Sequence, residues 1–218
     1  MSPSIAITSL KMQQVFIVGA LVCASCGCSG TGRSGEVHQG PDEVAPAEPA
    51  TESLQGWAAE TFELPPGFAP ELPTGVESLR FAPGWRDPKA EGFWSYAFVM
   101  WIDEPAPDEA RLGEILQKYY TGLMKAFAEG AGRQIDAESV QVEVLRLSAG
   151  RYEASMRLID AFATFEPIRL RILIDTSEAE DGDGMVRIRI SPQPEDHMIW
   201  SALEAASREI AGAGPGEK

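Results

Sequence analysis

The chain has 218 residues, of which 44% are hydrophobic, and its formal net charge is −15. Residues 1–50 hold two basic and four acidic side chains, so the rest of the chain holds 16 basic and 29 acidic ones, a net of −13. A domain with this charge repels phosphate backbones, which excludes nucleic acid as an expected partner. Beyond the first fifty residues the chain is long enough for one domain of ordinary size.

The N-terminal region has the pattern of a targeting segment. The apolar run 15–22 is too short to cross a bilayer as a stable helix, but it suits the core of a signal peptide. It leads into Ala24-Ser25 and then Cys26, and small residues just before a cysteine resemble the lipobox of bacterial lipoproteins. The resemblance implies that the signal peptide is removed and that Cys26 carries the lipid. Cys23 stands where that family usually has Leu, so lipidation at Cys28 and plain secretion stay open.

Composition divides the chain into four parts. We predict a signal peptide over 1–25, a flexible tether rich in Gly, Ser, Pro and Glu over 26–55, one α+β domain over 56–211 and a disordered tail over 212–218. All three cysteines precede residue 29, so the domain has no thiol chemistry of its own. We expect a cell-envelope protein anchored to the membrane by lipid, with secretion as the alternative.

The strongest core signal is the stretch Phe93–Asp103, FWSYAFVMWID. It is apolar at both parities of a period-two pattern, which predicts a strand covered on both faces. The segment 57–85 mixes aromatic residues with five prolines. Prolines argue against a helix or a central strand, so we predict an extended segment packed on the domain. A short strand at 78–82 is expected to form a hairpin with the core strand.

Two amphipathic helices and four alternating strands complete the pattern. One apolar stripe runs from Leu112 to Phe127 and another from Ile199 to Ile210, with strands expected near 140–147, 151–158, 168–175 and 184–190. We predict an α+β fold with an antiparallel sheet of about five to six strands, two helices packed on one face, and the order ββ-α-ββββ-α. This element order is similar to the PsbP/Mog1-type fold, which some bacterial lipoproteins use.

The outward positions of the predicted sheet form a candidate binding face. They gather six arginines in an acidic protein: Arg151, Arg157, Arg169, Arg171, Arg187 and Arg189. Guanidinium groups bind carboxylates and phosphates, so this face predicts docking of an acidic partner or an anion. The alternative is internal pairing, because Glu143, Glu153 and Asp175 occupy neighbouring outward positions.

The residues indicate no catalytic motif, cofactor or metal site. The acidic turn 178–184 lacks two ligands of a calcium loop and has the residues of a hairpin turn. His38 falls in the tether and His197 at the start of a helix. We predict a non-catalytic scaffold or protein-binding module on a membrane tether, with a possible envelope protein as partner. The alternative is a carrier of small ligands or anions, using an aromatic pocket or the arginine face, and a third reading is a carboxylate-dependent hydrolase.

Overall fold

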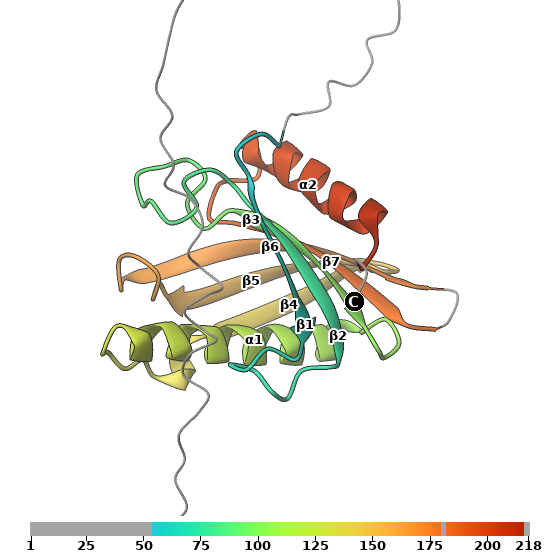
Figure 1. Ribbon diagram of the computed structural model, residues 1–218, viewed down its shortest axis with the longest axis horizontal. Helices are drawn as coiled ribbons and strands as arrows, with labels where there is room; N and C mark the ends of the chain where they lie inside the picture. Colours follow the sequence, from blue (N-terminus) through green and yellow to red (C-terminus); the bar gives the residue numbers. More distant parts are fainter. Residues whose placement is uncertain (1–53, 180–181, 216–218) are drawn as a thin grey trace, which may run out of the picture. The chain divides into compact units, whose positions relative to one another are not determined.

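The computed structural model describes residues 54–179 and 182–215, and its strands form one antiparallel sheet (Figure 1). In chain order the elements are β1 (Ala58–Leu64), β2 (Gly75–Phe81), β3 (Tyr96–Ile102), α1 (Glu109–Gly130), a 3₁₀ turn η1 (Ala137–Ser139), β4 (Gln141–Ser148), β5 (Arg151–Ile159), β6 (Pro167–Glu178), β7 (Gly184–Ser191) and α2 (Ile199–Ala213). The strand order across the sheet is β1-β2-β3-β7-β6-β5-β4. The predicted α+β class with an antiparallel sheet and two helices is confirmed.

The predicted core strand is β3, which lies between β2 and β7. Its side chains alternate between the two faces, and all of them are buried except Trp101, which is half-buried. Phe98 and Met100 join the main core under α1, whereas Ala97 belongs to a second cluster with Leu203 of α2. The expected hairpin with the preceding strand is also present, since β2 pairs with β3.

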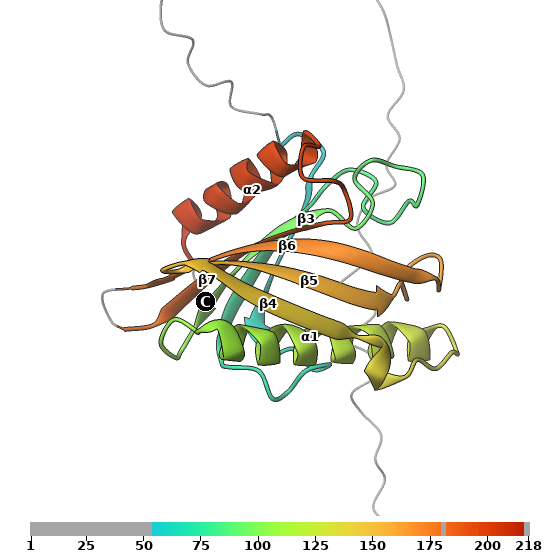
Figure 2. The ribbon, with the colours of Figure 1, turned by 180° about the vertical axis from the view of Figure 1, so that it is seen from behind.

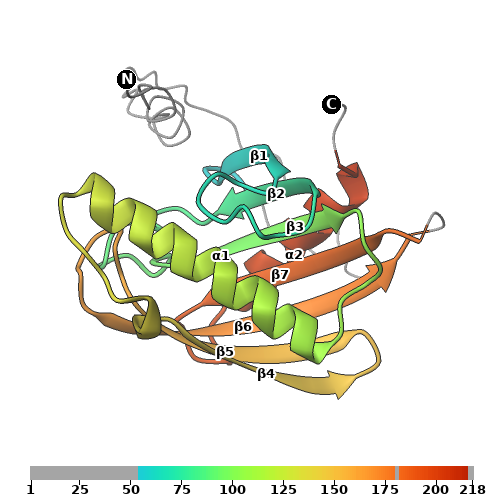
Figure 3. The same ribbon diagram turned by 90° about the horizontal axis from the view of Figure 1, so that it is seen from below.

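Helix α1 covers one face of the sheet (Figure 3). It begins after Asp108, whose side chain accepts a hydrogen bond from the backbone N–H of Arg111 at 2.9 Å, as an N-cap residue should. The loop between β1 and β2 presses on this helix. A Cβ on Gly122 would lie 2.0 Å from the carbonyl oxygen of Phe68, so only glycine permits this approach.

The sheet has seven strands, not the five to six that we predicted. The additional strand is β1, at one edge of the sheet. The prolines Pro65, Pro66, Pro70 and Pro73 all fall in the loop between β1 and β2, so they interrupt neither strand. The residues before Pro65 are therefore free to pair as an edge strand.

The prediction that both helices pack on one face is wrong. Helix α2 lies on the face opposite to α1 (Figures 1 and 2). The physical reason is that α1 and the β1–β2 loop already cover the apolar face. On the other face Ala97 is small enough to let the stripe of Leu203 and Ala206 approach the sheet.

Helix α2 packs mainly on β2, β3 and β7. The outward side chains of β4, β5 and β6 therefore have no helix over them. We call this part of the sheet the open face; it comprises Gln141, Glu143, Leu145, Glu153, Ser155, Arg157, Arg169, Arg171 and Leu173. Neither of the two helices that the structure describes is long and apolar enough to cross a membrane.

Candidate binding face

The strand register places all six predicted arginines on the face of the sheet that carries α2. Directly opposed residues of an antiparallel pair point to the same side. Arg157 lies opposite Arg169, and Asp175 lies opposite both Arg151 and Arg187. The period-two alternation brings the remaining arginines to the same side. The six arginines nevertheless occupy different environments, and these decide what each can bind.

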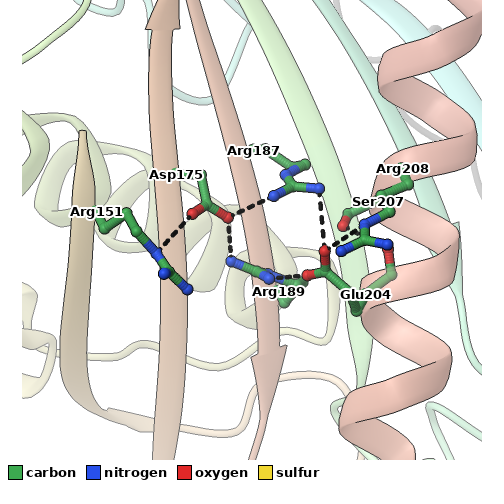
Figure 4. Close-up of polar contacts among 7 residues, drawn as sticks. All are labelled: Arg151, Asp175, Arg187, Arg189, Glu204, Ser207 and Arg208. Carbon is green, nitrogen blue, oxygen red and sulfur yellow. Dashed lines mark hydrogen bonds and ion pairs between the residues drawn. The ribbon is translucent and has the colours of Figure 1, made fainter. Parts of the chain in front are cut away.

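Arg187 and Arg189 lie beside α2 and form ion pairs with two carboxylates (Figure 4). Arg187 donates to Asp175 of β6 at 2.8 Å and to Glu204 of α2 at 3.2 Å. Arg189 donates to the same two carboxylates, and only 8% of its surface is exposed. Burial lowers the pKa of Arg189, while the negative charge of Asp175 raises it. These two arginines attach α2 to the sheet and are not free for a ligand.

The next arginines outward are also paired. Arg151 lies 3.4 Å from Asp175, and Arg208 of α2 donates to Glu204 at 2.7 Å. Arg171 forms ion pairs with Glu153 at 2.9 Å and with Glu195 at 2.7 Å. The internal pairing expected as the alternative from the sequence therefore occurs at Asp175 and Glu153.

Arg157 and Arg169 differ from the other four arginines, because neither side chain forms a hydrogen bond or ion pair with a described residue. Both side chains are exposed. They line a shallow hollow of about 470 Å³ at the end of the open face, together with Ser139, Gln141 and the apolar residues of the adjoining strand ends. None of the eight residues that line the hollow is acidic. Two cations are thus left uncompensated at one place.

Sequence reasoning missed a buried carboxyl group on the opposite face. Glu77 of β2 is fully buried, and its Oε1 accepts a hydrogen bond from the Tyr119 hydroxyl at 3.0 Å. Its other oxygen, Oε2, accepts no hydrogen bond from any residue that the structure describes. Burial raises the pKa of Glu77 to about 8. The hydrogen bond from Tyr119 lowers this pKa, and the negative charge of the nearby Glu60 raises it further. Burial also raises the pKa of Glu60 to about 7.

The strand pattern contained a signal for Glu77. In β2, Glu77 alternates with Leu79 and Phe81, so its parity is that of the core. The other fully buried acid, Asp160, is satisfied: it accepts from the Trp94 indole at 3.0 Å and from the backbone N–H of Thr164 at 2.7 Å. Of these two buried acids, Glu77 is the one that has an oxygen without a hydrogen-bond partner among the described residues.

Three further sequence predictions concern the lipid anchor, a metal site and the acidic turn. Cys26 lies outside the described residues. Within residues 54–179 and 182–215, no group of three His, Cys, Asp or Glu side chains is arranged to hold a metal ion. The acidic turn joins β6 to β7 as a hairpin, as its residues predict.

Comparison with known proteins gives no relative from which a site can be transferred. No protein-family model matches the chain, no curated protein matches it, and no solved structure matches it. The similarity to the PsbP/Mog1-type fold thus stays one of predicted element order.

Proposed function

We propose that the chain is a non-catalytic binding module, held in the cell envelope by a lipid on Cys26, that docks an acidic region of a partner protein on the open face. One observation carries the proposal. Helix α2 covers part of this face of the sheet, and the uncovered part presents Arg157 and Arg169, whose side chains have no partner within residues 54–179 and 182–215. In a chain of net charge −15, such cations attract a carboxylate locally, while the surrounding negative charge disfavours unspecific binding of polyanions.

The edge of the open face has the apolar character of a protein interface. Leu145 and Leu147 of the edge strand β4 are 62% and 57% exposed. An edge strand also presents backbone groups that a partner can pair with. Exposed apolar side chains on an edge strand offer a partner apolar contact together with backbone pairing.

Three observations support docking of a protein partner over catalysis or an aromatic ligand pocket. The residues that line the hollow include no carboxylate, histidine or cysteine to act as acid, base or nucleophile. The carboxyl with the raised pKa, Glu77, is fully buried on the other face of the sheet. The aromatic rings that could form a ligand pocket pack on one another instead. The rings of Phe81 and Trp85, for example, stack with their centroids 4.5 Å apart.

The tether is tested by metabolic labelling with palmitate. We expect label in the wild type and its loss in Cys26→Ala, because the acyl chains are attached to that residue. Cys28→Ala is the matched control and keeps the label. Label that persists in Cys26→Ala but disappears in Cys28→Ala moves the anchor to the second cysteine, and an unlabelled wild type rules out the anchor.

Docking is tested with a photo-crosslinking amino acid in cells. Leu145 on β4 and Met198 before α2 are both large, apolar and well exposed, at 62% and 71%. We expect a discrete adduct with one protein from position 145 and none from position 198. Equal adducts from both positions, or none from position 145, contradict docking on the open face.

A further inference from the structure

Resting on the proposed function, we infer that the hollow beside Arg157 and Arg169 is a subsite for one compact oxyanion, a phosphate or carboxylate group, held between the two guanidinium groups. It lies at the end of the open face, on adjacent strands β5 and β6. The proposal names the chemistry of the group and leaves to experiment whether the group is free or belongs to the partner.

The register provides the first reason. Arg157 and Arg169 are directly opposed in the β5–β6 pair, so their Cβ atoms lie about 5 Å apart on one side of the sheet. Like charges in that arrangement destabilise a sheet. A planar guanidinium presents a fork of donors that matches an oxyanion, and two forks side by side can share one anion. An anion between them removes the repulsion that the unliganded sheet contains.

The contrast with the other four arginines is the second reason. Arg151, Arg171, Arg187 and Arg189 each have at least one carboxylate within 3.4 Å. In each of these four cases a strand neighbour or α2 supplies the carboxylate. Of the six arginines, only Arg157 and Arg169 have no carboxylate partner among the residues that the structure describes.

The lining of the hollow is the third reason. Gln141 of β4 lies opposite Arg157 and extends the polar row, whereas the hydroxyl of Ser139 in η1 already donates to the backbone carbonyl of Asp136 at 2.6 Å. The adjoining row is Ile159 and Pro167, which are apolar. The side-chain amide of Gln141 can donate to the same anion, and the apolar walls carry no side-chain acceptor that competes for the guanidinium groups. No acidic side chain of the lining competes with the ligand.

A second hollow, of about 290 Å³, does not meet these conditions. It lies at the C-terminal end of α2 and is lined by Arg187 and Arg208. Asp175 is part of the same lining, and both arginines already form ion pairs. The long-range repulsion from the acidic domain does not decide between the hollows, because physiological salt screens exposed charges beyond about 8 Å.

The test is titration of the purified full-length chain with inorganic phosphate at constant ionic strength, read by calorimetry and by the thermal midpoint. We expect saturable binding, and a loss of affinity of about tenfold or more in Arg157→Gln/Arg169→Gln, because each substitution removes a charge-assisted hydrogen bond. Without phosphate this variant should have a thermal midpoint equal to or above that of the wild type. A structural role for the pair predicts a lower midpoint instead.

The matched control is Lys118→Gln/Lys125→Gln, which removes two positive charges from the exposed side of α1, across the sheet. It should bind phosphate as the wild type does. Equal losses in both double variants, or no saturable binding by the wild type, overturn the subsite.

Parallel titrations distinguish the sources of the group. Acetate represents an isolated carboxylate, and a hexaglutamate peptide represents an acidic protein segment. If phosphate binds but position 145 yields no protein adduct, the subsite stands for a free anion and the docking function fails. If the adduct falls in Arg157→Gln/Arg169→Gln but the wild type does not bind phosphate, the docking function stands and the subsite for a compact oxyanion fails.

Discussion

Replacing Glu77 with glutamine is expected to make the domain more stable than the wild type at pH 8, while at pH 5 the two should differ little. Burial raises the pKa of Glu77 from 4.5 to about 8, so the side chain is protonated in the folded protein at neutral pH. In the unfolded chain it ionises in water near its ordinary pKa. Glutamine keeps the oxygen that accepts from Tyr119, but it cannot ionise.

The sign follows from the direction of the shift. A carboxyl whose folded pKa is raised contributes its stability in full below pH 4.5 and loses it as the pH rises to about 8. Over that range the free energy of unfolding falls by an amount on the order of 5 kcal/mol, a large part of a typical domain's stability. Glu60, whose pKa is raised to about 7, changes stability in the same direction.

Urea unfolding of both proteins at several pH values between 5 and 8.5 measures this difference. The wild type should lose stability steadily across the series, and Glu77→Gln should follow a flatter curve that keeps only the slope contributed by Glu60. Glu63→Gln is the control, since that side chain is exposed on β1 and its substitution should leave the slope as in the wild type. Parallel curves for wild type and Glu77→Gln would refute a buried, protonated Glu77.

Removing either carboxylate from between the arginines beside α2 is expected to cost about 3 kcal/mol or more, and removing both to cost more than the sum. Asp175 and Glu204 together face four guanidinium groups, from Arg151, Arg187, Arg189 and Arg208 (Figure 4). Removing one carboxylate leaves the partly buried cations Arg187 and Arg189 with a single shared counter-charge, and a buried charge that is only partly compensated costs more than the loss of an exposed pair. After one substitution Arg187 and Arg189 keep one carboxylate partner, and after both substitutions they lose the two carboxylates that compensate them. The effects of the two substitutions are therefore coupled.

A double-mutant cycle with Asp175→Asn and Glu204→Gln, followed by chemical denaturation, tests this coupling. Adding Arg189→Met to Asp175→Asn should restore part of the stability, because the buried cation is removed together with its partner. Singles that each cost under about 0.5 kcal/mol, as exposed ion pairs do, would show that the cluster does not attach α2 to the sheet.

Local structure was largely predictable from the sequence because strands and helices follow from side-chain periodicity. The alternation of Val186, Ile188 and Ile190 with Arg187 and Arg189 locates β7 and assigns its two faces, and the structure agrees. The five-to-six-strand estimate failed at β1, since its seven residues lie beside a proline-rich loop that dominated the composition of the region.

What the sequence did not determine was long-range placement. The stripe of α2 is compatible with either face of a sheet, and the choice depends on α1 having taken the apolar face and on the small Ala97 opposite Leu203. The same choice decides the site, because Glu204 reaches Arg187 and Arg189 only from that face. The spacing of the six arginines in the sequence does not show which four form ion pairs and that Arg157 and Arg169 do not.

The structure also limits which arginines can be changed in a functional test. Reversing the charge of Arg187 or Arg189 would disrupt the attachment of α2, so a loss of binding would not be interpretable. Arg157 and Arg169 are exposed and unpaired with any described residue, so substituting them leaves the fold intact.

The most direct measurement is therefore the yield of the crosslink from position 145 in cells that carry Arg157→Gln/Arg169→Gln. If the open face docks an acidic partner through this pair, the adduct should fall about tenfold or more, while Lys118→Gln/Lys125→Gln leaves it at the wild-type level. An adduct of undiminished yield in the arginine variant would contradict the central proposal.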